Sequence, residues 1–173
     1  TSLYTNDGSG NFSLVPDTNI TGVANGEVTW GDYNNDGYLD LLIVGYASPE
    51  SPGAEIPVLK VYKNNAGGSF TEIPFTWGLG NATARWGDVD NDGDLDIVAS
   101  GYFGEFAIFR LVYTDFYENK GNDVFEYNPR YSAAGTEWGA VDWVDIDNDA
   151  DLDLVLSGYN SFAWGDNSPL AFH

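Results

Sequence analysis

The clearest pattern along the chain is a set of three apolar stretches that each end in Gly-Tyr. They cover residues 39–46, 95–102 and 152–159. A loop rich in Asp precedes each stretch, and a Trp lies two residues before the first Asp of each loop (Trp30, Trp86 and Trp143). The loops begin at positions 32, 88 and 145, so they lie 56 and 57 residues apart. A fixed period of this kind indicates a repeat architecture.

A second marker recurs in phase with the first. It reads Tyr-x-Asn followed by Phe, with a spacing of eight from Tyr to Phe, as Tyr4/Asn6/Phe12, Tyr62/Asn64/Phe70 and Tyr117/Asn119/Phe125. We therefore interpret residues 1–173 as a single repeat array. Its units cover residues 25–80, 81–135, and 136–173 completed by 1–24.

Each unit is predicted to contain four strands. In the middle copy these are residues 83–88, residues 95–102, a segment within 107–119, and a short run from Val124, with Gly, Asn and Asp between them. Residues 105–120 lack Gly and Pro and are long enough for a helix. Their Phe, Tyr, Ile and Val favour a strand, and the equivalent stretch of the first copy contains Pro57.

Units of this size with four strands are typical of an all-β fold, the β-propeller, whose blades are sheets of four antiparallel strands. The three repeats make only part of a ring, because a closed propeller has about four to eight blades. Since each blade buries both faces, we expect the three repeated Trp residues in the blade core.

Composition excludes several classes of function. The chain has 6 Lys+Arg and 27 Asp+Glu, a formal net charge of −21. This charge argues against nucleic acid and against an anionic membrane surface as partners. The apolar runs are too short for membrane insertion. Cys is absent, so disulfides and thiol chemistry are excluded.

The Asp-rich loops have the spacing of a cation site. Oxygen ligands at positions 1, 3, 5 and 9 of a tight loop converge, and the carbonyl of position 7 completes the set. Clustered carboxylates repel one another unless a cation lies among them. Six to eight oxygen ligands suit Ca²⁺ better than Mg²⁺, and the lack of Cys, with a single His at position 173, disfavours zinc and copper.

An EF-hand does not explain the loops. That motif needs a Glu at position 12 and flanking helices, whereas position 12 here is Ile43, Ala99 or Leu156. Gly37 and Gly93 suit position 6, where a positive φ is needed. Ala150 takes that position in the third loop, which we expect to be strained by about 1 kcal/mol. Asn34 leaves the first loop one carboxylate short.

The loop pattern, followed by an apolar strand that ends in Gly, resembles the FG-GAP/VCBS repeat of integrin-like propellers. The resemblance covers nearly the whole chain and implies up to three Ca²⁺ per chain. By position, the implied ligands are Asp32, Asn34, Asp36, Tyr38 (carbonyl), Asp40; Asp88, Asp90, Asp92, Asp94 (carbonyl), Asp96; and Asp145, Asp147, Asp149, Asp151 (carbonyl), Asp153. It also implies an extracellular or cell-surface, secreted protein with an adhesive or lectin-like role toward a glycan or an extracellular protein.

The two ends of the chain match each other in phase. The chain opens on the marker of a third strand and stops after a second strand. Two arrangements remain open: a homodimer whose two chains complete a six-bladed ring, or a piece cut from a longer array.

The Gly-Tyr positions and one further Trp are candidates for a ligand face: Tyr46, Tyr102, Tyr159 and Trp164. The alternative function is a calcium-dependent polysaccharide-active enzyme, a hydrolase or lyase, with Glu137 or Asp142 as its acid or base. Against it, 13 of the 27 carboxylates lie in the three loops, and no nucleophile with a neighbouring base is evident elsewhere. We therefore expect a non-catalytic module.

Overall fold

A computed structural model describes residues 1–47, 55–75, 77–106 and 109–159. In this part of the chain every regular element is a strand: β1 Tyr4–Asn6, β2 Phe12–Leu14, β3 Val23–Gly31, β4 Asp40–Ala47, β5 Ile56–Asn64, β6 Phe70–Ile73, β7 Gly80–Gly87, β8 Asp96–Phe106, β9 Phe109–Asn119, β10 Phe125–Tyr127, β11 Glu137–Val144 and β12 Asp153–Tyr159. Within the same residues, no helix is long and apolar enough to cross a membrane. The all-β prediction is confirmed, as is the strand predicted within residues 107–119.

The strands form two complete antiparallel sheets and two hairpins. Blade 1 has the order β3-β4-β5-β6, and blade 2 has the corresponding order β7-β8-β9-β10. The N-terminal hairpin is β1-β2, and the C-terminal hairpin is β11-β12. The sheets of four antiparallel strands are those expected of propeller blades.

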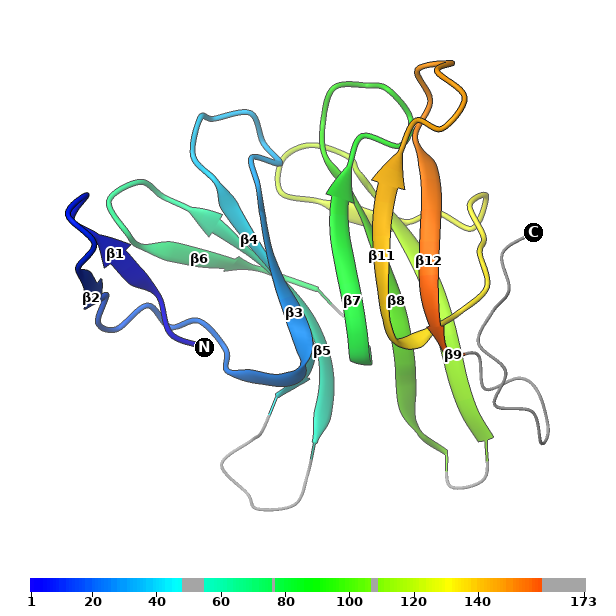
Figure 1. Ribbon diagram of the computed structural model, residues 1–173, viewed down its shortest axis with the longest axis horizontal. Helices are drawn as coiled ribbons and strands as arrows, with labels where there is room; N and C mark the ends of the chain where they lie inside the picture. Colours follow the sequence, from blue (N-terminus) through cyan, green and yellow to red (C-terminus); the bar gives the residue numbers. More distant parts are fainter. Residues whose placement is uncertain (48–54, 76, 107–108, 160–173) are drawn as a thin grey trace.

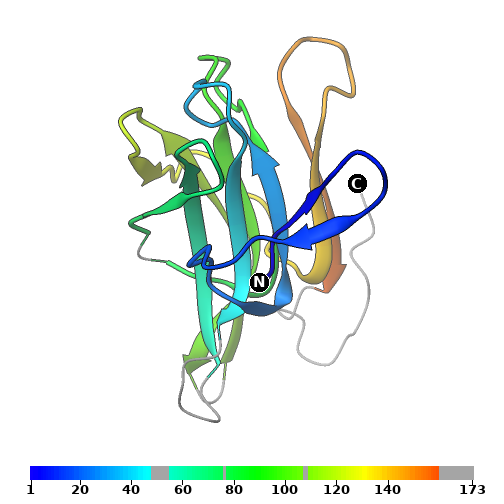
Figure 2. The same cartoon turned by 90° about the vertical axis from the view of Figure 1, so that its left-hand side faces the viewer.

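The four sheets follow one another along the array. Figure 1 shows the N-terminal hairpin beside blade 1 and the C-terminal hairpin beside blade 2, at opposite ends of the molecule. Figure 2, turned by 90°, shows the N-terminal hairpin in front of blade 1. Strand β7 packs on β3 and β4, and β11 packs on β7 and β8. The two hairpins do not pair with each other in one chain, so their joining into one blade stays a prediction.

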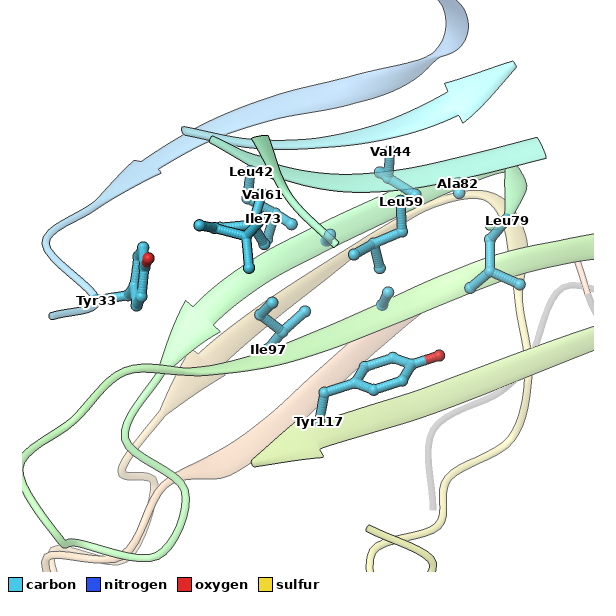
Figure 3. Close-up of a cluster of buried hydrophobic side chains, with 12 residues drawn as sticks. Tyr33, Leu42, Val44, Leu59, Val61, Ile73, Leu79, Ala82, Ile97 and Tyr117 are labelled. Atoms are coloured by element: carbon cyan, nitrogen blue, oxygen red, sulfur yellow. The ribbon is translucent and has the colours of Figure 1, made fainter. Parts of the chain in front are cut away.

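The main core lies between the two blades. Figure 3 shows Leu42 and Val44 of β4 facing Ile97 of β8 and Tyr117 of β9. The alternate residues Leu41 and Ile43 are buried on the opposite face of β4. Because this strand is buried on both faces, its sequence is a continuous apolar run and not an alternating one.

Trp and Gly residues join successive units. The ring of Trp86 in blade 2 lies over Gly31 of blade 1, so close that a Cβ on Gly31 would meet Trp86 Cδ1 at 2.6 Å. Trp143 of the C-terminal hairpin covers Gly87 of blade 2 in the same way. The expectation that all three repeated Trp lie in the core is wrong for Trp30. Trp30 is 43% exposed, and among the described residues its ring lies against Phe70 of its own blade and not against the Gly of an earlier blade.

Candidate metal centre

The three Asp-rich loops share one hydrogen-bond pattern. We call residues 32–40, 88–96 and 145–153 loop 1, loop 2 and loop 3; each connects the first two strands of its unit. In loop 2 the carboxylate of Asp88 accepts the N–H groups of Asp92 at 3.0 Å and Gly93 at 3.0 Å. In loop 1 the Asp32 carboxylate accepts the N–H groups of the two equivalent residues, and in loop 3 the Asp145 carboxylate does the same. These short-range bonds curl each loop around its first carboxylate.

Carboxylate oxygens converge in two of the loops. In loop 2 the oxygens of Asp88, Asp90 and Asp96 lie within 4.8 Å of one another. In loop 3 those of Asp145, Asp147 and Asp149 do so. The described residues contain no comparable trio of acids in loop 1, whose position 3 is an Asn. Its amide oxygen accepts the N–H of Asp36 at 3.1 Å, as the Asp90 carboxylate of loop 2 accepts that of Asp92 at 3.3 Å.

The carboxylate at position 9 is buried in loops 1 and 2. Asp40 is 0% exposed and accepts the N–H groups of Tyr33 at 3.2 Å and Asn64 at 2.8 Å. Burial raises the pKa of Asp40 to about 6, although these two hydrogen bonds lower it. Asp96 accepts two backbone N–H groups in the same way, and burial raises its pKa to about 6 as well. Without a cation, both carboxylates therefore hold protons more tightly than in an unfolded chain.

Loop 3 differs at position 9. Asp153 accepts the N–H of Ile146 at 3.0 Å, as Asp40 and Asp96 accept the N–H of the second residue of their own loops. It is nevertheless exposed, because no third strand lies beside β12 within the described residues. The trio of loop 3 accordingly involves positions 1, 3 and 5, whereas that of loop 2 involves position 9.

Neighbouring loops are joined by the Asn at position 4. Asn35 of loop 1 donates to Asp94 of loop 2 at 2.8 Å. Asn91 of loop 2 donates to Asp151 of loop 3 at 2.7 Å. The residue at position 7 of loops 2 and 3 therefore connects its loop to the preceding one. Within its own loop, the N–H of position 7 donates to the carboxylate at position 5. In loop 1 the side chain at this position, Tyr38, is exposed.

Position 6 has a positive φ in every loop. The values are 88° at Gly37, 96° at Gly93 and 76° at Ala150. The strain expected at Ala150 therefore has its structural basis, because a Cβ is disfavoured in this conformation.

The residues of the loops fit a hard cation chemically. Every candidate side chain offers oxygen, the first carboxylate is oriented by two N–H groups, and two loops gather three acids within 4.8 Å. A family model described as an FG-GAP-like repeat matches residues 1–43 and 46–99. The chain belongs to the FG-GAP-like repeat family. No curated protein and no solved structure matches it.

The FG-GAP-like match covers loops 1 and 2 and ends within β8. Loop 3 lies beyond it but repeats its hydrogen bonds. This recurrence extends the repeat to all three units, and it supports a propeller-like module.

The residues proposed for a ligand face differ in how exposed they are in the FG-GAP-like array. Tyr46 is 8% exposed, and its ring lies against Gly80 of blade 2. Tyr102 is half-buried, whereas Tyr159 of the C-terminal hairpin is 53% exposed. Trp164 lies outside the described residues. The repeated Tyr is therefore more buried in blade 1, where the following unit covers it, than in the C-terminal hairpin.

The two acids considered for catalysis lie in different surroundings. Glu137 is buried and accepts the side-chain amide of Asn81 at 3.4 Å. Asp142 is exposed and lies 3.9 Å from Arg85 Nε.

Two functional positions were missed in the sequence. Asn64 and Asn119 were recognised as markers, but not as donors to the position-9 carboxylates. The Asn at position 4 was not recognised as a link between loops, although it is present in all three copies. Its invariance within the repeat was the available signal.

Proposed function

We propose that this chain is a calcium-stabilised β-propeller module that acts outside the cell or at its surface and binds a glycan or an extracellular protein without catalysis. Up to three Ca²⁺ ions are held by the fifteen loop ligands named above. The observation that carries this proposal is the convergence of three carboxylates within 4.8 Å in loops 2 and 3. Such acids are mutually repulsive until a cation neutralises them.

Calcium fits these loops better than other metals. Carboxylate, amide and carbonyl oxygens at flexible spacing suit the six to eight ligands of Ca²⁺. Mg²⁺ demands a stricter octahedron and keeps more waters. A set made only of oxygen donors also disfavours zinc.

Calcium titration of one conservative variant tests the metal site. Asp90→Asn gives loop 2 the residue that loop 1 carries naturally at position 3, so the loop is expected to keep its shape. We expect calorimetry to show calcium binding by the unmodified chain and at least tenfold weaker binding at one site of the variant. The matched control is Asp142→Asn, which removes an exposed acid outside the loops. Equal loss in both variants, or no binding by the unmodified chain, would refute the proposal.

The non-catalytic role is tested by a screen of polysaccharide substrates together with a glycan array. We expect calcium-dependent retention of a glycan or an extracellular protein and no turnover. Cleavage that is abolished by Glu137→Gln would establish the enzyme alternative instead.

The C-terminal hairpin supports a homodimeric ring. In blades 1 and 2 the position-9 carboxylate accepts an N–H from the third strand, at Asn64 and Asn119. The third copy of this marker is Asn6 in β1. Its side-chain oxygen accepts the N–H of Gly8 at 2.9 Å, the same local turn that Asn64 and Asn119 make. Asn6 therefore has the local geometry of the third-strand donor for Asp153, a donor that the described residues of a single chain do not supply.

The open edge of β1 presents the right donors. Val15 N–H donates to Leu3, and Asp7 N–H donates to Asn11, across the N-terminal hairpin. Because hydrogen bonds alternate along an antiparallel pair, the N–H groups of Tyr4 and Asn6 point to the open edge. Three apolar side chains of this hairpin are also more than half exposed: Tyr4, Phe12 and Leu14. We infer that β1 of a second copy pairs with β12.

Light scattering after gel filtration tests this assembly. With calcium present, we expect about twice the chain mass of 18.8 kDa. Tyr4→Pro removes one edge donor without touching the pairing to β2, and should give single chains. Tyr4→Phe retains the donor and should still associate. A single-chain mass at every concentration, the same in all three proteins, would contradict the dimer.

A further inference from the structure

A cavity of about 300 Å³ lies on blade 2 beside the segment that connects the blades, and no described residue of the Asp-rich loops lines it. Five aromatic rings and one acid line it: Trp77, Phe103, Tyr113, Asp115, Tyr117 and Tyr127. Trp77 belongs to the segment that connects the blades, and its carbonyl accepts the N–H of Leu59 in blade 1 at 3.2 Å. The other five residues belong to β8, β9 and β10 of blade 2.

The rings form walls at steep angles to one another. The Trp77 and Phe103 centroids are 4.6 Å apart with planes inclined by 53°. The planes of Phe103 and Tyr113 meet at 76°, and those of Tyr117 and Tyr127 at 64°. Trp77 and Tyr127 are 50% and 54% exposed. The cavity therefore offers several aromatic faces in different orientations, and not one flat platform.

Among the described residues that line the cavity, Asp115 is the one charged group. Burial raises the pKa of its carboxyl. Among the described residues, its hydrogen-bond donor is the Tyr117 hydroxyl at a long 3.5 Å. A half-buried acid with so little compensation is unfavourable by itself, and a cation between the rings would neutralise it.

We propose that this cavity binds an organic cation, an alkylated ammonium group, with the aromatic faces around the positive charge and Asp115 as its counter-ion. Aromatic faces within about 6 Å attract a cation through the ring quadrupole, most strongly when water is excluded. The cavity volume is at the lower end of the roughly 300–1,000 Å³ of small-molecule sites, which suits a head group of a few carbons. This binding activity goes beyond the proposed calcium sites and does not require them.

Two other ligands fit less well. One carboxylate does not supply the several oxygen ligands of a divalent metal. A neutral sugar needs a set of placed polar groups to fix its hydroxyls, and here most of the lining is aromatic carbon. The net charge of −21 also raises the local concentration of cations around the protein.

A pair of isosteric probes tests the role of charge. Choline and its uncharged analogue 3,3-dimethylbutan-1-ol are titrated into the calcium-loaded chain at constant ionic strength, with Trp fluorescence and amide NMR shifts as readouts. We expect choline to bind at least tenfold more tightly and to shift the amides around Trp77 and Tyr127. Equal affinity for the two probes, absence of choline binding, or tighter binding of N-acetylglucosamine would overturn the proposal.

Matched variants assign the site. Asp115→Asn keeps the volume of the side chain, and Trp77→Leu keeps an apolar one; each should weaken choline binding at least tenfold. The controls are Asp142→Asn and Trp138→Leu, an exposed acid and an exposed Trp outside the cavity. Thermal melts identify any variant that fails to fold, and Tyr113→Phe, which retains the ring, should then still bind. Unchanged affinity in folded Asp115→Asn would refute the assignment.

These results are separable from the calcium proposal. Calcium titration reports on the loops whether or not choline binds, and choline is expected to bind the calcium-free chain as tightly as the calcium-loaded one.

Discussion

The backbone N–H of Asn64 donates to the carboxylate of Asp40 at 2.8 Å. Asp40 ends loop 1, and Asn64 ends the third strand of blade 1. The side-chain amide of Asn64 also donates to the carbonyl of Leu39 at 3.0 Å. One residue thus holds the candidate metal loop against the outer half of its blade, and Asn119 repeats the arrangement with Asp96.

Replacing the side chain of Asn119 should destabilise the fold. It is buried and donates to the carbonyl of Tyr33 in loop 1 at 2.8 Å and to that of Leu95 at 3.3 Å. Asn119→Ala leaves these carbonyls without their donor and should lower the free energy of unfolding by about 2 kcal/mol. Urea denaturation measures the change.

The matched control for that variant is Asn6→Ala. Asn6 makes the same turn but is exposed, so its replacement should cost less than about 0.5 kcal/mol in dilute, unassociated protein. Equal losses in the two variants would show that the bonds between loop and strand add nothing to stability.

The stabilising effect of calcium should depend on pH. In the metal-free protein Asp40 and Asp96 have pKa values of about 6, above the ordinary 3.8. The folded state therefore binds more protons than the unfolded state, and this stability is present below about pH 4 and lost as the pH rises through about 6. A bound ion replaces the protons, so calcium should raise the melting temperature more at pH 7.5 than at pH 5.

That comparison requires calcium-free buffer, not a chelator, because chelators themselves lose affinity in acid. Asp96→Asn removes one of the two titrating groups and should flatten the pH dependence. A calcium effect of the same size at both pH values would contradict the linkage.

Relief of strain in loop 3 should stabilise the chain. Ala150 has a φ of 76°, where its equivalents are glycines. Ala150→Gly should raise the free energy of unfolding by about 1 kcal/mol. The reciprocal variant Gly93→Ala should lower it by a similar amount. Chemical denaturation without calcium measures both, and changes of the same sign would disprove the explanation.

Val144 should weaken the junction between copies. It is the third-unit counterpart of Gly31 and Gly87, on which the Trp of the following unit lies. In the proposed ring, Trp30 of a second copy meets this position. Val144→Gly should therefore tighten dimer formation several-fold in sedimentation measurements. A weaker dimer, with monomer stability unchanged, would exclude the proposed ring geometry.

Most of the repeat architecture could be predicted from spacing. The apolar runs predicted β4, β8 and β12, and the loop pattern predicted which nine residues curl together. Both predictions succeed because the deciding contacts are local: strand pairing through a short loop, and hydrogen bonds that Asp88 accepts from residues four and five positions later.

The spacing did not predict which repeated residues are buried. Trp30 and Trp86 occupy the same place in their units, yet within the described residues Trp86 lies on Gly31 of the preceding blade and Trp30 lies on no such Gly. Burial of an equivalent residue depends on the neighbouring unit, which the internal pattern of one unit does not contain.

The sequence by itself determined the repeat period, the strands and the three Asp-rich loops, because each depends on residues close together in the chain. Only the tertiary structure decided how the units meet. It brought Asn35 to Asp94, placed Trp77 opposite Phe103, and left Asp115 among aromatic rings. These contacts join residues far apart in sequence, and they depend on the angle at which one twisted sheet lies against the next.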